Sequence, residues 1–230
     1  MNRTPRTADR SVEISPAILY FGTPVVLLGT RNEDGSSNLA PISSAFWLGH
    51  RAVIGMGAGS HTITNLRRNG ACVLNLPSAE QAHVVDRIAL TTGSDPVPEG
   101  KLRKGYRHEA DKFGLAGLTP RTGLSVDAPR ALECPVQLEA EAVAFHSLAE
   151  DDPEQRGRVL TVELEVVRVH VAEEIRMPGH PNRIDPDRWR PLIMSFQELY
   201  GLGPRLRPSR LAGVDEELYR TPSRVPSGVG

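Results

Sequence analysis

Short segments of β-branched and aliphatic residues, separated by turn residues, recur along the first third of this sequence and restrict the folds open to it. Segments 24–30, 37–46 and 52–57 have this composition. Turn residues at 32–35 and 48–50 leave only short links between them. Because short links join strands that run in opposite directions, the pattern predicts sequential antiparallel strands.

A helix and a fourth strand are expected next. Residues 60–69 read as a helix with Ser60 or Thr62 as its N-cap, stopped before Gly70. A strand over 71–76 follows at once. The order strand, helix, strand places the start of this helix directly after the third strand.

Two long strands are expected later, over 133–146 and 158–173. In the second, the apolar residues occupy even positions from Leu160 to Val166 and so share one face. From Val167 onward the apolar residues occupy odd positions instead. Such a change of phase predicts a bulge or a corner. About six strands with few helices favour a mainly β fold, a closed or partly closed antiparallel barrel.

The remaining segments are expected outside this barrel. A helix over 78–89 is predicted to lie against it. The stretch 91–123, rich in Gly, Pro and charge, is predicted to be a surface excursion with a short helix around 108–113. We expect a flexible segment over 1–14, one domain over 15–175, and a C-terminal extension over 176–230 that wraps the domain or a partner subunit.

Composition excludes several classes of protein. Lys and Arg total 27 against 28 Asp and Glu, which gives a net charge of -1. Such a chain has no overall positive potential that would attract nucleic acid or anionic lipid. We find no apolar stretch of membrane-spanning length, and a cytoplasmic protein is the simplest interpretation. Cys72 and Cys134 lie in apolar runs and predict core residues, so neither a disulfide framework nor a metal site is expected.

The first candidate binding segment is the start of the 60–69 helix. The glycines at 55, 57 and 59 suggest a dinucleotide fingerprint, but Ser60 stands where that pattern needs its last glycine. Ser60, His61 and Thr62 would still present hydroxyls and unpaired N–H groups to a phosphate. The alternative is a plain N-cap without a ligand.

The second candidate is the strand segment 37–44. Pro41 interrupts it and removes a backbone N–H, which predicts backbone turned away from a neighbouring strand. A flat ligand that needs backbone hydrogen bonds would suit this segment. The alternative is a kink at the barrel edge with no ligand.

Taken together, these segments resemble the flavin reductase-like family, which has the FMN-binding split barrel. The likeness covers roughly residues 15–173 and includes the order of motifs at 38–44, 60–66 and 73–77. It implies a six-stranded antiparallel Greek-key barrel, and a homodimer that binds FMN near its interface. The implied ring-binding residues are Asn38, Leu39, Ala40, Pro41, Ile42, Ser43 and Ser44. The implied phosphate-binding residues are Ser60, His61, Thr62 and Asn65.

The resemblance also implies a reaction. We expect an NAD(P)H-dependent flavin reductase that passes hydride through N5 of FMN, with NADH or NADPH as electron donor and a partner oxygenase or a small-molecule substrate as acceptor. Two alternatives stay open: an FMN enzyme that acts on a dedicated small molecule, and a non-catalytic flavin or electron carrier. Many relatives place Lys or Arg where this chain has His61, so its hold on the phosphate is predicted to depend on pH.

No side chain is obligatory for such a reaction, because the protein mainly orients donor and flavin. His146 and His170 are secondary candidates for proton donors; the alternative is that they are exposed residues at strand ends. Arg103, Lys104 and Arg107 are candidates for contacting a pyridine-nucleotide phosphate, with a solvated surface cluster as the alternative.

Overall fold

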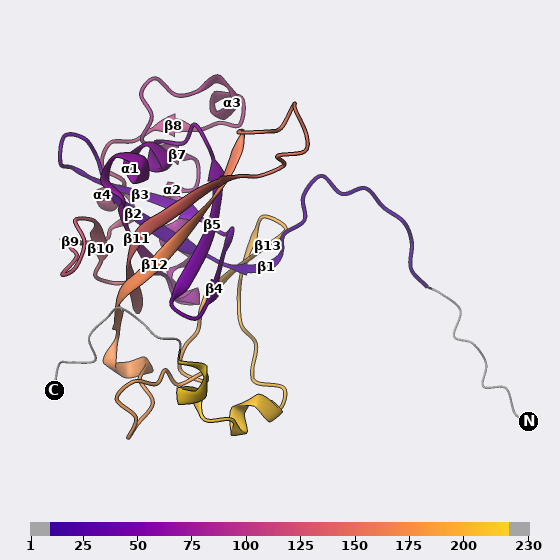
Figure 1. Cartoon of the computed structure of the whole chain (residues 1–230), viewed down its shortest axis with the longest axis vertical. Helices are drawn as coiled ribbons and strands as arrows, with labels where there is room; N and C mark the ends of the chain where they lie inside the picture. Colours follow the sequence, from indigo (N-terminus) through magenta and orange to yellow (C-terminus); the bar gives the residue numbers. More distant parts are fainter. Residues whose placement is uncertain (1–9, 221–230) are drawn as a thin grey trace, which may run out of the picture.

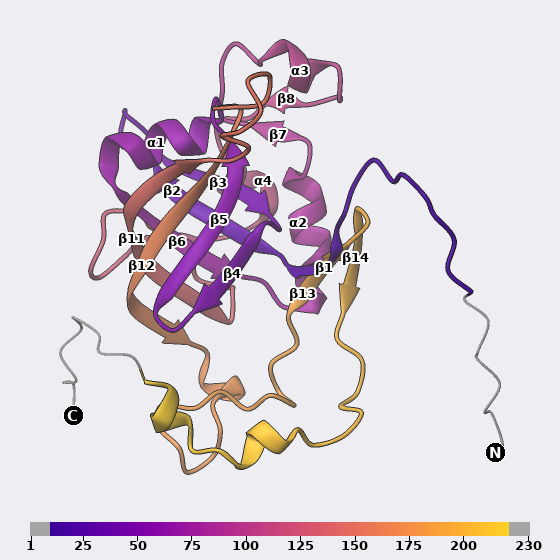
Figure 2. The same cartoon turned by 45° about the vertical axis from the view of Figure 1, so that its right-hand side comes forward.

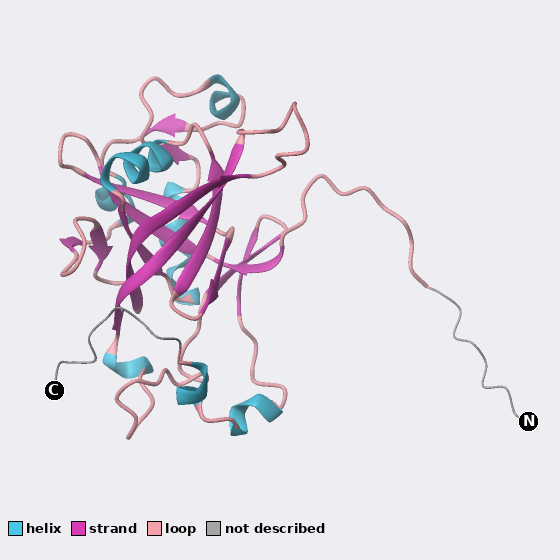
Figure 3. Cartoon of the chain, viewed as in Figure 1, coloured by secondary structure: helices cyan, strands magenta, loops and turns pink. Residues whose placement is uncertain are grey.

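The computed structural model describes residues 10–220 and shows a mainly β architecture (Figure 3). One antiparallel sheet dominates it (Figure 1). In sheet order its seven strands within the described range are β3 (Ser37–Ile42), β2 (Val26–Arg31), β6 (Ala71–Leu76), β11 (Val136–Ser147), β12 (Val159–Val171), β5 (Arg51–Gly57) and β4 (Ala45–Leu48).

The expected strand over 37–46 is in fact two strands. β3 pairs with β2 and β4 pairs with β5, both antiparallel as predicted, but β3 and β4 lie at opposite edges of the sheet. Only Ser43 and Ser44 separate them along the chain, so the sheet curls until its two edges approach each other. Pro41 lies in the edge strand β3, where a missing N–H breaks no central ladder. Closure of the barrel stays a prediction.

The predicted change of phase in the long strand β12 is confirmed as a bulge. Glu139 of β11 pairs with Arg168, while the next residue, Ala140, pairs with Val166. Val167 is therefore the extra residue. Before the bulge the even-numbered residues of β12 face inward, and after it the odd-numbered residues do. The bulge also lets one strand continue around the curve of the sheet.

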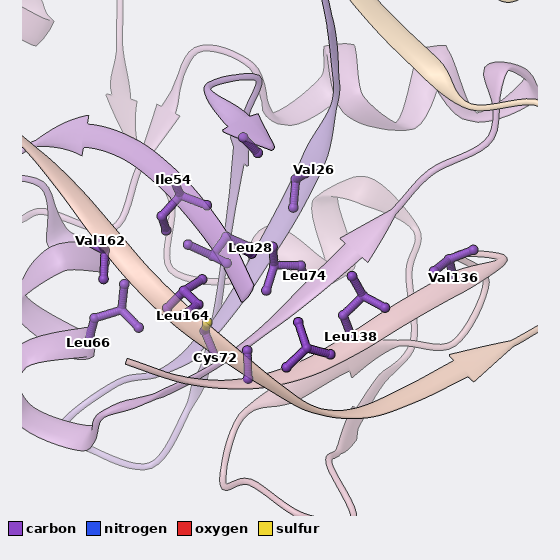
Figure 4. Packing of buried hydrophobic residues seen from close by; sticks show 14 of the residues in the cluster. Val26, Leu28, Ile54, Leu66, Cys72, Leu74, Val136, Leu138, Val162 and Leu164 are labelled. Carbon is purple, nitrogen blue, oxygen red and sulfur yellow. The ribbon is translucent and has the colours of Figure 1, made fainter. Parts of the chain in front are cut away.

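Buried side chains fill the inside of the curled sheet. Leu28, Ile54, Leu74 and Leu164 meet there from four strands (Figure 4). The helix α1 (His61–Asn69) covers one end of this cluster and contributes Ile63 and Leu66. Burial of these apolar side chains is the main stabilising term of the sheet.

A second cluster lies on the other side of β2 and β3. The helices α2 (Ala82–Ile88) and α4 (Lys112–Ala116) enclose it, and it contains Leu27, Leu39 and Phe113. The prediction that 91–123 is wholly a surface excursion is therefore wrong, because Phe113 is buried in this cluster and Thr91 and Thr92 are buried as well. The short helix also begins later than expected, with Asp111 as its N-cap.

Several short elements complete the structure. Strands β7 (Thr91–Thr92) and β8 (Arg107–His108) flank the helix α3 (Glu99–Leu102), and β9 (Pro120–Thr122) pairs with β10 (Pro129–Ala131). Four single-turn 3-10 helices occur within residues 10–220: η1 (Ala79–Gln81), η2 (Glu173–Ile175), η3 (Arg210–Gly213) and η4 (Glu216–Tyr219).

The C-terminal extension is partly integrated into the body. The strands β13 (Leu192–Ser195) and β14 (Glu198–Gly201) pair with β1 (Phe21–Pro24) in a separate sheet. Leu192 is buried in the second cluster, and Ile184 and Trp189 pack against the first. The rest passes below the main sheet (Figure 1). The expected terminal segments 1–14 and 176–230 lie in part outside the described residues, at 1–9 and 221–230.

The described residues also limit two kinds of site. Across residues 10–220 we find no helix long and apolar enough to cross a membrane. Within the same range, no three His, Cys, Asp or Glu side chains are grouped so that they could hold a metal ion.

Candidate functional site

The helix α1 begins where β5 ends, as the sequence predicts. Ser60 is its N-cap, and its hydroxyl accepts a hydrogen bond from the backbone N–H of Ile63 at 3.3 Å. Gly70 ends the helix in the left-handed conformation. Thr62 and Asn65 are three positions apart and share a face. Both are buried, and they direct polar groups toward β2 and β3.

A buried network of amides and hydroxyls joins α1 to these two strands. Asn38 Nδ2 donates to Thr30 Oγ1 at 2.9 Å and to Thr62 Oγ1 at 3.3 Å. Asn65 Nδ2 donates to Thr30 Oγ1 at 3.1 Å and to Asn32 Oδ1 at 2.9 Å. A hydroxyl accepts two hydrogen bonds and donates one, so Thr30 keeps only its hydrogen to offer. Among residues 10–220 that hydrogen has no acceptor.

Positively charged side chains surround this network. Lys112 is only 3% exposed, and its Nζ donates to Asn38 Oδ1 at 3.1 Å. This is the one acceptor found for its three N–H groups within the described residues. Arg68 donates to Asn65 Oδ1 at 3.0 Å and to the carbonyl of Arg31. Lys101 Nζ lies 2.8 Å from the hydroxyl of the buried Thr92. Lys112 and Arg68 therefore donate into the network itself, and Lys101 adds a positive charge close to Lys112.

His61 contributes a donor whose hydrogen can be assigned. Its Nε2 lies 2.8 Å from Asn32 Oδ1, which already accepts from Asn65 Nδ2. Because this oxygen is an acceptor, Nε2 carries the hydrogen and the neutral ring has a lone pair on Nδ1. Only a protonated His61 could donate from Nδ1 as well.

The electrostatics agree with an excess of positive charge. Burial and the nearby ammonium of Lys101 lower the pKa of Lys112 to about 8, against a smaller opposing effect of Glu109. Burial, Lys112 and Arg68 lower the pKa of His61, and burial lowers the pKa of Lys101. Within residues 10–220, no carboxylate forms an ion pair with any of these three protonated groups. An anion placed among these groups would raise all three pKa values.

Gly93 lets the chain approach this cluster closely. A Cβ at this position would lie 2.6 Å from His61 Cδ2 and 3.1 Å from Asn38 Oδ1. The backbone that follows β7 therefore packs directly on His61 and Asn38. Any larger residue here would displace one of them.

The predicted ring-binding segment lies at the open edge of the sheet. Leu39 is buried in the second core cluster, so its side chain serves packing, whereas Ala40, Pro41, Ile42 and Ser43 are partly exposed and Ser44 is exposed. The Ser44 carbonyl accepts from the Gly55 N–H at 2.8 Å. As an edge strand, β3 presents unpaired backbone groups on its free side.

The structure separates the two candidate histidines. His146 lies opposite Thr161 at one end of the long hairpin, and His170 lies opposite Gln137 at the other. His146 is exposed. His170 Nε2 is 2.6 Å from a carboxylate oxygen of the fully buried Glu139, so it is engaged in a structural contact.

Two of the three candidate cations near α3 are already paired. Arg103 contacts Glu99 at 2.7 Å and Arg107 contacts Glu109 at 2.8 Å, both on the surface. Lys104 is exposed. These contacts agree with a solvated cluster, although binding of a pyridine nucleotide there stays a prediction.

We call the following residues the donor cluster: Thr30, Asn32, Asn38, His61, Thr62, Asn65, Arg68, Lys101 and Lys112. Sequence reasoning missed five of them as site residues: Thr30, Asn32, Arg68, Lys101 and Lys112. Lys112 left a signal, because it stands between the helix cap Asp111 and the apolar Phe113 in the first turn of a helix that is mostly buried. Thr30 and Asn32 gave a weaker one, as polar residues at the end of an apolar strand.

Comparisons with known proteins agree with this arrangement. The family model described as "Flavin reductase like domain" matches residues 18–202. The chain is 38% identical over 194 residues to the protein YdfE of Bacillus subtilis (strain 168). The aligned region covers 84% of this chain and 90% of YdfE.

Solved structures share the fold. The flavoredoxin of Desulfovibrio vulgaris (Miyazaki F) matches with a TM-score of 0.70 and 22% identity, over 88% of this chain and 99% of that one. Component B of nitrilotriacetate monooxygenase from Bacillus cereus matches with a TM-score of 0.67 and 18% identity, over 87% of this chain and 100% of that one. This chain thus belongs to the flavin reductase-like family and is a flavin-related oxidoreductase with the split-barrel fold.

Proposed function

We propose that this protein is an FMN-binding oxidoreductase of the NAD(P)H-dependent flavin reductase type. The observation that carries the proposal is the surplus of hydrogen-bond donors at the start of α1. Thr30 and Lys112 offer more N–H and O–H groups than the described residues accept, and His61 adds a further N–H only when it is protonated. A phosphate supplies oxygen acceptors and negative charge, which is what this cluster lacks.

The donor set fits FMN in both of its parts. Around the phosphate, Ser60, Thr62 and the N–H groups of the first turn of α1 would join Lys112 and the protonated form of His61. The planar ring would lie along Ala40 to Ser44, where an edge strand offers backbone donors and acceptors. Asn38 connects the two parts, because it lies in β3 and contacts both Thr62 and Lys112.

The chain's own residues act by placement. FMN held by these residues would supply a hydride acceptor at its N5 and a route for electrons to a further acceptor. Backbone groups from Ala40 to Ser44 and the hydroxyls of Ser43 and Ser44 would fix the ring and oppose negative charge on it. NADH or NADPH would approach its open face, near the segment 91–112. No described side chain needs to act as a nucleophile.

The proposal extends to the setting of the reaction. We place the protein in the cytoplasm as a homodimer with FMN near its interface. Its reduced flavin would serve a partner oxygenase or a small-molecule substrate. A net charge of -1 gives no reason to add nucleic acid or a membrane as a partner.

Reduction under anaerobic conditions tests the reaction type. We expect apoprotein reconstituted with FMN to be yellow and to bleach within seconds when NADH or NADPH is added. A bound flavin that ignores both nucleotides would assign the protein to one of the alternatives, an enzyme for a dedicated substrate or an electron carrier. Apoprotein that retains no FMN would overturn the proposal as a whole.

Alanine variants test the placement of the phosphate. Thr62→Ala should weaken FMN binding by about tenfold, as expected for one lost hydrogen bond to a charged group. Asn65→Ala should weaken it indirectly, because the Asn65 amide holds Thr30 and Asn32 in place. Thr64→Ala is the matched control, because Thr64 lies on the exposed face of the same helix. Equal dissociation constants for all three variants would contradict the placement.

A further inference from the structure

Residues 11–20 form an arm that leaves the body of the protein. They contain no helix or strand within the described range, and they run from β1 away from the main sheet in both views (Figures 1 and 2). Large apolar side chains on the arm are exposed: Val12 by 82%, Ile14 by 74% and Leu19 by 68%. An extended segment with this much exposed apolar surface is typical of one that packs on another molecule.

The sequence of the arm has the alternation of a strand. Val12, Ile14, Ile18 and Tyr20 occupy even positions, and Glu13 and Ser15 lie between the first of them. In extended backbone the even positions share one face. The arm therefore presents one mainly apolar face, with Leu19 on the opposite face and with Pro16 as an interruption that an outlying strand tolerates.

A matching apolar surface is found on β4. All four of its residues are apolar, which is the pattern of a strand covered on both faces. Ala45 and Trp47 face the core, whereas Phe46 is 52% exposed and Leu48 is 73% exposed. The outer face of β4 thus has the composition of an interior surface and lacks a cover within residues 10–220.

The surface around the base of the arm is also apolar. β1 lies against β4 and carries the exposed Phe21, whose ring meets that of Phe196 edge to face at 4.9 Å. Exposed aromatic side chains of this kind are enriched in the centres of protein interfaces.

We propose that the arm of residues 11–20 docks on the outer face of β4 in a second copy of the chain, and receives that copy's arm in return. The arm is fixed at its base, where the Tyr20 carbonyl accepts from the Phe196 N–H at 2.9 Å, and from there it leads away from its own β4. Reciprocal exchange about one two-fold axis would cover the apolar face of each arm and the outer face of each β4.

Arm exchange would also complete the candidate site. β4 follows Ser43 and Ser44 directly, so an arm on β4 lies beside the predicted ring-binding segment. The inference deepens the homodimer proposed above by naming its contact. Its tests need no flavin, so their failure can be told apart from a failure of the proposed reaction.

Cysteine cross-linking tests where the arm docks. Single variants Ile14→Cys and Leu48→Cys are mixed and oxidised; the natural Cys72 and Cys134 are buried and do not compete. We expect a disulfide-linked species of twice 25.1 kDa from this mixture. Ile14→Cys mixed with Leu90→Cys is the control, since Leu90 is exposed on a different surface. No cross-link, or equal cross-linking in both mixtures, would overturn the inference.

A double variant separates exchange from back-folding. Ile14→Cys/Leu48→Cys in one chain should yield linked dimers. If oxidation instead closes the disulfide within single chains, the arm docks on its own β4 and the inference is wrong.

Sedimentation measures the contribution of the arm. Val12→Ser/Ile14→Ser/Ile18→Ser should raise the dissociation constant of the dimer by about a hundredfold or more, since three side chains of the apolar face lose their cover. The matched control replaces three exposed leucines of the C-terminal segment, Leu206, Leu211 and Leu218, with serine. A monomeric unmodified protein, or equal effects of the two triple variants, would overturn the inference.

Discussion

Two buried charged groups in this protein have opposite surroundings. Glu139 is fully buried in β11, and its carboxylate accepts hydrogen bonds from the backbone N–H groups of Leu124, Ser125 and Val126 and from His170. Lys112 is buried in α4, and Asn38 Oδ1 is the single acceptor for its Nζ within residues 10–220. The first charge is satisfied within the protein, and the second is left with unpaired donors.

The pKa values express the same difference. Burial raises the pKa of Glu139, but the hydrogen bonds from Leu124, Ser125 and His170 outweigh burial, and the pKa is lowered. For an acid, a lowered pKa means that the fold stabilises the charge. For Lys112 burial lowers the pKa to about 8, which for a base means that the fold opposes the charge. A buried charge that the fold stabilises indicates a structural role. A buried charge that the fold destabilises indicates a site that binds a group of opposite charge.

The largest effect is expected from Glu139→Gln. An amide in this place turns an acceptor into a donor that faces three backbone N–H groups, so unfolding should become easier by about 3 kcal/mol, equivalent to about 10 °C in Tm. Urea and thermal unfolding measure this. Glu141→Gln, at an exposed position of the same strand, is the control, and similar losses in both variants would contradict a structural role for Glu139.

The acid dependence of stability has a definite sign. Because the pKa of Glu139 is lower in the folded protein, its contribution is present above the ordinary pKa of glutamate and is lost as pH falls through the folded value.

Lys112→Met should separate binding from stability. Affinity for FMN is expected to fall tenfold to about a hundredfold, since a hydrogen bond to a charged group is lost. The apoprotein at pH 7 should instead gain about 1 kcal/mol, because relief from a buried charge exceeds the loss of the contact with Asn38. Lys104→Met is the exposed control. A destabilised apoprotein that binds FMN normally would show that Lys112 is structural.

Gly93→Ala tests the close packing over the donor cluster. The added methyl group would meet the His61 ring, so affinity for FMN should fall about tenfold with a stability loss of about 1 kcal/mol. A methyl group at Gly100 would meet nothing within 4 Å, which makes Gly100→Ala the control. Indistinguishable variants would mean that His61 moves freely and does not position the anion.

The smallest effect is the dependence of FMN binding on pH. Bound phosphate favours protonated Lys112, so the dissociation constant should rise as pH increases through about 8, by no more than about tenfold per pH unit. Titrations between about pH 7 and 9 would show this rise in the unmodified protein and a flat profile in Lys112→Met. The lowered pKa of His61 places its own dependence below the neutral range, which sharpens the expectation drawn from the sequence.

Much of the fold could be predicted from local patterns. Short apolar runs and turn residues indicated the pairing of β2 with β3 and of β4 with β5, and the phase change in β12 indicated its bulge. The separation of β3 from β4 could not be read in this way. It depends on the curvature of the whole sheet, and Ser43 and Ser44 carry no pattern that marks a change of edge.

The candidate site was predicted only in part. Hydroxyls and amides at the start of α1 were visible because a helix cap has a local signature. Lys112 and Thr30 were missed because their contacts with Asn38 and Asn65 link segments far apart in the sequence. The role of His170 was also beyond reach, since Glu139 lies 31 positions away from it and nothing in the sequence joins the two.

The central claim is that the donor cluster at α1 binds the phosphate of FMN, and riboflavin tests it most directly because it has the same ring without the phosphate. We predict that the unmodified apoprotein binds FMN at least a hundredfold more tightly than riboflavin, and that Lys112→Met removes most of this preference. Equal affinity of the unmodified protein for the two flavins would contradict the account.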